Sequence, residues 1–130
     1  MTAAEGAVAG RPRIWLRAEG LAAFGFSSAI YFAIGGPWWL YLVLLLAPDL
    51  AMLGYLGGPK IGAVLYNVVH SYVGPAALAV IGAVTGSVAF GVALIWFAHI
   101  GLDRFLGYGL KYPSAFGHTH LGLLGRKQTD

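Results

Sequence analysis

The stretch that decides the fold is residues 88–106, VAFGVALIWFAHIGLDRFL. It is close to the roughly 20 residues that an α-helix needs to cross a bilayer. Its two charged residues, Asp103 and Arg104, stand near its end. The stretch therefore predicts a transmembrane helix, and the spacing of His99 and Asp103 places both side chains on one face of it.

Three further apolar stretches precede this one, at about residues 21–34, 38–56 and 61–85. Turn-forming glycines and prolines separate them, at residues 35–37, 57–60 and 86–87. The composition agrees, because 58% of the 130 residues are hydrophobic and only 10% are charged, against roughly a quarter charged in soluble domains. We predict an all-α fold, an integral membrane bundle of four transmembrane helices, antiparallel in sequence order, with a short C-terminal cytoplasmic segment.

The basic residues predict the orientation of these helices. With a cytoplasmic N-terminus, all eight lie on the cytoplasmic side: Arg11, Arg13, Arg17, Lys60, Arg104, Lys111, Arg126 and Lys127. This distribution follows the positive-inside rule, so it indicates topology and not a nucleic-acid partner. We expect a bacterial-type inner membrane with both termini cytoplasmic. The expected parts are a flexible tail (1–13), the transmembrane domain (14–106) and a C-terminal loop and tail (107–130).

Four titratable side chains are expected to share one depth in the bilayer. At a rise of about 1.5 Å per residue, Asp49, His70 and His99 lie roughly 10–13 Å from the cytoplasmic ends of their helices, and Asp103 lies roughly 5 Å from it. Ionisable groups are costly in lipid and tend to be functional there. We therefore expect these four side chains to converge in one cavity, supported by Glu19, Asn67 and Arg104.

Imidazole and carboxylate groups together suit Zn, Mn or Fe. We predict a divalent metal held by Asp49, His70, His99 and Asp103. Such a metal would activate water, and a carboxylate or imidazole would accept the proton, so the predicted catalytic residues are Asp49, His99 and Asp103. A structural alternative pairs Asp103 with Arg104 and Glu19 with Arg17, while the histidines only bond across helices.

The segment after the last apolar stretch could cover this cavity. Residues 107–122 hold glycines, aromatic residues, Lys111, His118 and His120, which suits either a lid or an anchor at the headgroup level. Pro48 and Pro75 each remove a backbone hydrogen bond from a helix at the depth of the site. The roles of the two histidines stay open.

Several motifs together resemble a known family. They are Ala47–Leu50, Leu53–Leu56, Tyr66–Asn67, His70, His99-x-Gly101-x-Asp103-Arg104, Gly107–Pro113 and Thr119–Gly122. Over about residues 17–125 they resemble a family of small bacterial four-helix membrane proteins of unknown function. More loosely, Pro48-Asp49, His70 and His99-x3-Asp103 are similar to the membrane-bound metal-dependent hydrolases, a likeness that implies a metal and hydrolysis. In those families a Thr-His pair lies within the bundle, whereas Thr119-His120 follows the last apolar stretch here.

The sequence leaves several functions open. The first is a metal-dependent membrane hydrolase acting on a lipophilic substrate. A metal-free acid–base enzyme, an isomerase or cyclase, could use Asp49 and Asp103. His70 and His99 could hold a b-type haem, and a proton-linked transport subunit also needs intramembrane acids. The expected partners are the lipid bilayer and, because glycine is abundant at 20 residues, a second copy in a homo-oligomer.

Overall fold

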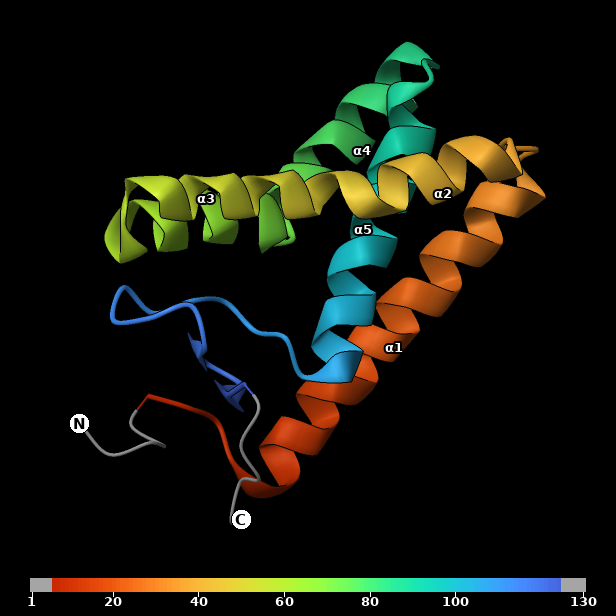
Figure 1. The fold of residues 1–130 in the computed structure, drawn as a ribbon. Helices are drawn as coiled ribbons and strands as arrows, with labels where there is room; N and C mark the ends of the chain where they lie inside the picture. Colours follow the sequence, from red (N-terminus) through yellow and green to blue (C-terminus); the bar gives the residue numbers. More distant parts are fainter. Residues whose placement is uncertain (1–5, 125–130) are drawn as a thin grey trace.

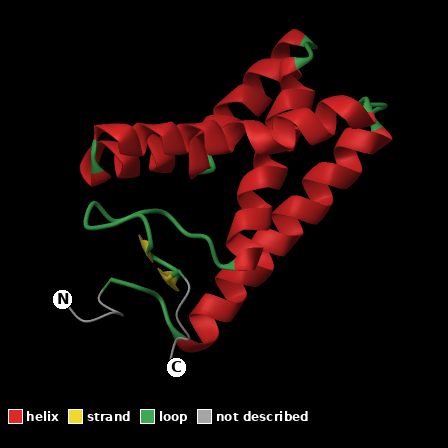
Figure 2. Ribbon diagram, viewed as in Figure 1, coloured by secondary structure: helices red, strands yellow, loops and turns green. Residues whose placement is uncertain are grey.

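The computed structural model describes residues 6–124, and helices dominate this part of the chain. The helices are α1 (Gly10–Ala33), α2 (Trp38–Leu46), the 3₁₀ helix η1 (Ala47–Gly57), α3 (Pro59–His70), α4 (Val73–Thr85) and α5 (Ala89–Leu106). Two short strands, β1 (His118–Thr119) and β2 (Gly122–Leu123), pair antiparallel in the C-terminal segment (Figures 1 and 2). The predicted helical class is confirmed.

Three pairs of packed helices meet near the middle of α5. Helix α1 lies along α5, and α4 packs beside the first part of α5. Helix η1 and α3 form a hairpin, the third pair, which runs away from the α1–α5 pair (Figure 1). The start of η1, the end of α3 and the middle of α5 therefore lie close together.

Two of the expected helices change direction or type along their length. Helix α2 passes into the 3₁₀ helix η1 at Ala47, next to Pro48. The helix predicted over residues 61–85 is instead two helices, because Ser71 is extended, with φ −92° and ψ 153°. Pro75 has no N–H to donate to the carbonyl of Ser71, so the hydrogen-bond ladder cannot continue through this point.

The close approach of α1 and α5 depends on two glycines. A Cβ atom at Gly101 would lie 2.5 Å from the carbonyl oxygen of Gly20, and one at Gly20 would lie 2.6 Å from the carbonyl oxygen of Gly101. Small residues allow such contact between backbones, as in membrane helix packing. A buried cluster of Tyr31, Leu94 and Ala98 continues this interface toward the other end of the pair.

Three helical stretches are long and apolar enough to cross a membrane: Trp38–Gly57, Pro59–Thr85 and Ala89–Leu106. Helix α1 is not among them, since three arginines and Glu19 lie in its first half. Large apolar side chains are exposed on these stretches, including Leu56 and Val84. The stretches and their apolar surfaces indicate a membrane protein.

The C-terminal segment folds back onto the helices and onto the start of the chain. The N–H of Val8 donates to the carbonyl of His120 over 2.7 Å, and Nε of Arg13 donates to the carbonyl of Leu121 over 2.8 Å. Nε of Arg17 donates to the carbonyl of Phe105 over 2.8 Å. Helix α1 begins at Gly10, earlier than the predicted boundary after residue 13. Two of the eight basic residues that predict the orientation, Arg126 and Lys127, lie outside the described residues.

Candidate metal centre

Four side chains from three elements form one compact group. One ligand atom from each of Asp49, His70, His99 and Asp103 lies within 4.8 Å of the others. Nε2 of His70 lies 3.2 Å from Nε2 of His99, 3.3 Å from Oδ1 of Asp49 and 3.5 Å from Oδ2 of Asp103. Nε2 of His99 lies 3.2 Å from each of these two carboxylate oxygens. The structure thus brings together the four side chains that we expected to converge because they lie at similar depths in the bilayer.

The local structure of each element aims these groups inward. Asp49 stands in the first turn of η1, directly after Pro48, where α2 changes into the 3₁₀ helix. His70 is the last residue of α3. His99 and Asp103 follow each other by one turn on α5. Both imidazoles are buried, whereas the side chains of Asp49 and Asp103 are 41% and 16% exposed, so the group opens on its carboxylate side.

In each histidine the hydrogen bond made by Nδ1 determines whether Nε2 is a hydrogen-bond donor or an acceptor. Nδ1 of His70 lies 2.9 Å from the carbonyl oxygen of Tyr66, and Nδ1 of His99 bonds the carbonyl oxygen of Leu45. Because a carbonyl only accepts, each Nδ1 carries the hydrogen. In the neutral rings both Nε2 atoms are then lone-pair acceptors, facing each other and two carboxylates.

Four acceptors in one place need a cation or additional protons between them. Tetrahedral ligands at about 2.0–2.2 Å from a metal are about 3.3–3.6 Å apart. The five separations given above run from 3.2 to 3.5 Å. The group could therefore hold a metal ion, and its Nδ1–carbonyl bonds are the kind that orient metal-binding histidines.

Neighbouring side chains fix the end of α3 that carries His70. Nη2 of Arg104 donates to the carbonyl of His70 over 2.6 Å, and Nη1 donates to the carbonyl of Tyr108 over 3.0 Å. The ring of Tyr66 stacks on that of His70 with centroids 3.7 Å apart. Arg104 thus supports the group through backbone carbonyls, and Arg17, as shown above, binds the carbonyl of Phe105 and not the side chain of Glu19.

Two residues expected near the group have other positions. Glu19 is exposed and is not a member of the group; it lines a separate cavity of about 290 Å³ with Tyr72 and His120. Asn67 does not bond either imidazole Nδ1, whose partners are backbone carbonyls. Instead Asn67 Oδ1 accepts from the N–H of Lys111 over 2.6 Å, and its Nδ2 donates to the carbonyl of Lys111 over 2.8 Å. The spacing of three residues predicted that Asn67 and His70 share a helix face. It did not predict the hydrogen-bond partner of Asn67.

A cavity of about 320 Å³ adjoins the carboxylates of the group. It is lined by Asp49, Met52, Tyr66, Asp103, Tyr108, Lys111 and Phe116. Lys111 is 4% exposed, and burial lowers the pKa of its amine to about 8, although the carboxylates of Asp103 and Asp49 act in the opposite direction. Lys111 is not among the site residues predicted from the sequence. The feature that pointed to it is that it is the single lysine in the aromatic segment 107–122, which suits either a lid or a membrane anchor.

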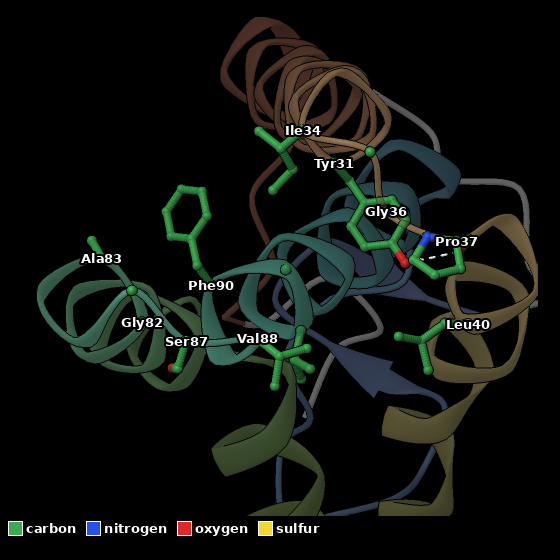
Figure 3. A pocket seen from close by; sticks show the side chains of 14 residues that line it. Tyr31, Ile34, Gly36, Pro37, Leu40, Gly82, Ala83, Ser87, Val88 and Phe90 are labelled. Atoms are coloured by element: carbon green, nitrogen blue, oxygen red, sulfur yellow. Dashed lines mark hydrogen bonds between the residues drawn. The ribbon is translucent and has the colours of Figure 1, made fainter.

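A different cavity, of about 410 Å³, lies where α1 leads into α2 and α4 turns into α5. Figure 3 shows Tyr31, Pro37, Gly82 and Phe90 around it, with the hydroxyl of Tyr31 bonded to the carbonyl of Pro37 over 2.8 Å. Its lining is mainly apolar and includes no histidine, acid or basic residue. This cavity therefore offers no imidazole, carboxylate or basic side chain that could form a centre like the one described above.

The fold and the group define a helical protein of membrane type with a His/Asp cluster that could hold a metal. The chain belongs to the family described as Domain of unknown function (DUF4260), whose model matches residues 13–124. This match confirms the expected membership of a family without an assigned function. No curated protein and no solved structure matches the chain.

Proposed function

We propose that this protein is a metal-dependent membrane hydrolase acting on a lipophilic or amphipathic substrate. The observation that carries the proposal is the convergence of two Nε2 lone pairs and two carboxylate oxygens. A divalent cation, Zn, Mn or Fe, would neutralise the two carboxylates and satisfy both imidazoles at once. Without a cation these groups repel one another unless additional protons lie between them.

The metal would supply Lewis acidity, which lowers the pKa of water and polarises an ester or phosphate oxygen. The chain would supply binding and proton transfer. His70, His99 and Asp103 are the more buried members and are suited to hold the cation. Asp49 is the more exposed carboxylate and lines the cavity, so it is placed to accept a proton from water that enters from that side.

The distance between the imidazoles favours this function over haem binding. Two axial nitrogens at about 2 Å from one iron lie about 4 Å apart on opposite sides of it, whereas the Nε2 atoms here are 3.2 Å apart. Acidic side chains at this position also suit a hard divalent cation better than a porphyrin.

We place the protein in a bacterial-type inner membrane with four crossing segments, α1 being the first, and with both termini cytoplasmic. Four basic residues support this orientation, because their contacts place them near the start of α1 and the end of α5. They are Arg13, Arg17, Arg104 and Lys111. A reporter fused to the C-terminus should be active only in the cytoplasm; activity in the periplasm would reject the orientation. Exposed apolar faces also support a homo-oligomer, which a monomeric mass in detergent would contradict.

Elemental analysis of the purified protein, together with an absorption spectrum, tests the proposed metal. We expect about one divalent ion per chain in the wild type and its loss in His99→Ala. The control is His118→Ala, since His118 lies in β1 and its Nδ1 faces Ser114 Oγ at 2.6 Å. A protein that stays metal-free after incubation with Zn, Mn and Fe would overturn the proposal and favour metal-free acid–base chemistry.

A further inference from the structure

Lys111 places a buried positive charge beside the candidate metal centre. Its Nζ has no hydrogen-bond partner among residues 6–124. The atom lies 3.7 Å from the ring centroid of Phe116 and 4.7 Å from that of Tyr66. Such cation–π contacts offset only part of the hydration that an ammonium group loses on burial. The cavity thus contains a strong donor that lacks an acceptor.

The backbone of Lys111 is held in place by a residue of α3 that is next to Tyr66 in sequence. Asn67, on α3, makes two hydrogen bonds to it, one with the N–H and one with the carbonyl. Lys111 also forms an antiparallel bridge with Thr119, which is fully buried. A backbone fixed in this way keeps the side chain of Lys111 directed at the same region, and preorganised donors are typical of binding sites.

The charge around the cavity changes once a metal is included. Two carboxylates, Asp49 and Asp103, are balanced in the protein alone by two buried cations, Lys111 and Arg104. A divalent cation would balance the carboxylates by itself and leave Lys111 without a countercharge in this cavity, whereas Arg104 lines the neighbouring cavity together with Glu19. Uncompensated buried charge is costly, so the metal-loaded site calls for an anion.

The mouth of the cavity combines three large, mainly apolar side chains with the carboxylate of Asp49. Met52, Tyr108 and Phe116 are 40%, 42% and 43% exposed and line it. The volume, about 320 Å³, is at the small end of the roughly 300–1,000 Å³ found for small-molecule sites. It can take a headgroup and the first carbons of a chain, while the rest of the chain extends past the aromatic rim.

We propose that this cavity binds the oxyanion headgroup of an amphipathic substrate and that the ammonium group of Lys111 is its counter-ion. The inference rests on the proposed function, because the metal offsets the carboxylates that would otherwise repel an anion. It names the substrate class as a phosphate ester or carboxylate attached to an apolar chain. Asn67 is a positioning residue that acts through the backbone of Lys111.

Binding of dodecyl phosphate to the full-length, metal-loaded protein in a neutral detergent tests this inference. A hydrogen bond to a charged group contributes about 1.5–3 kcal/mol, so Lys111→Met should bind dodecyl phosphate about 10- to 100-fold more weakly. Lys60→Met is the matched control, because Lys60 is exposed at the start of α3, and it should bind as the wild type does. Asn67→Ala should weaken binding while Lys111 is retained.

Two further readouts separate the possible failures. Inorganic phosphate distinguishes the source of the anion: weaker binding than dodecyl phosphate supports an amphipathic ligand, and equal binding overturns the amphipathic assignment. Metal content is measured on the same samples. If the wild type holds metal and Lys111→Met still binds dodecyl phosphate normally, this inference fails and the proposed function stands. If the wild type holds no metal yet binds the probe only with Lys111 present, the proposed function fails and Lys111 remains the anion site.

Discussion

Nε2 of His70 lies 3.2 Å from Nε2 of His99, while Nδ1 of each ring faces a backbone carbonyl. Two imidazoles can approach in this way with little repulsion only if something positive lies near both Nε2 atoms. Asp49 and Asp103 are the other groups within reach, and they are acceptors too. The relationship between the two histidines is therefore compatible with either a metal ion or an added proton between the rings.

Metal removal should lower thermal stability. A ligand that binds only the folded state stabilises it by about 2.7 kcal/mol at a free concentration of 100 times its dissociation constant. We expect a chelator to lower the unfolding temperature of the wild type, and added Zn to restore it. The double variant His70→Ala/His99→Ala should not respond to the chelator; an equal shift in that variant would indicate a metal bound elsewhere.

Asp49 and Asp103 should differ in their effects on metal and activity. Asp103 is the more buried carboxylate, and we expect Asp103→Asn to remove most of the metal. Asp49 is 41% exposed at the cavity, so Asp49→Asn should retain more metal while reducing hydrolysis by about 10²–10⁴-fold, the contribution typical of a general base. Metal content and turnover of an ester of an amphipathic phosphate, measured together, check this difference. If both variants lose metal equally, Asp49 and Asp103 both act as metal ligands, and the role of Asp49 as a general base is contradicted.

Arg104 should act on the metal through the backbone of His70. Arg104→Lys cannot span the two carbonyls that the guanidinium now binds, those of His70 and Tyr108. Changes to groups that orient a ligand typically reduce metal affinity about 10- to 100-fold. Zn titration measures the effect, with Arg17→Lys as control because Arg17 also donates to a backbone carbonyl, that of Phe105, which does not belong to a residue of the centre. Unchanged affinity in Arg104→Lys would show that this support is not needed.

The crossing of α1 and α5 should tolerate no side chain at Gly101. The Cβ atom of Gly101→Ala would lie 2.5 Å from the carbonyl oxygen of Gly20 and 2.6 Å from the N atom of Phe24. Overpacking costs about 1–3 kcal/mol, and because both partners are backbone we expect the upper part of this range. Gly25→Ala is the control, since its Cβ would meet nothing within 4 Å. Unfolding in detergent should show a lower free energy of unfolding for Gly101→Ala than for the wild type. Gly25→Ala should show no decrease.

Anion binding should depend on pH through Lys111. Its amine is charged below a pKa of about 8, whereas an exposed lysine stays charged to about pH 10.4. The titratable groups that face it across the cavity are Asp49, Asp103, Tyr66 and Tyr108. Dodecyl phosphate is already dianionic at pH 7.5, since its second pKa is about 6, so its affinity should fall as the pH rises from 7.5 to 9. Lys111→Met should show a flat profile; a parallel fall in that variant would assign the titration to another group.

The sequence by itself determined the helical class, the apolar stretches and the residues of the cluster. These features depend on composition and on the constant rise of a helix, which converts residue number into depth. Asp49, His70, His99 and Asp103 could therefore be grouped before any contact between helices was known. Family membership likewise followed from motifs that are local in sequence.

The tertiary structure alone decided how the helices cross and what covers the cluster. The break at Ser71 turns α3 away from α4, and Gly20 with Gly101 sets the approach of α1 to α5. The pairing of Asn67 with Lys111 joins residues far apart in sequence. Such contacts depend on which surfaces remain available after the helices pack, and residue spacing carries no information about that. For this reason Lys111 entered the site only when its burial and its missing hydrogen-bond partner could be seen.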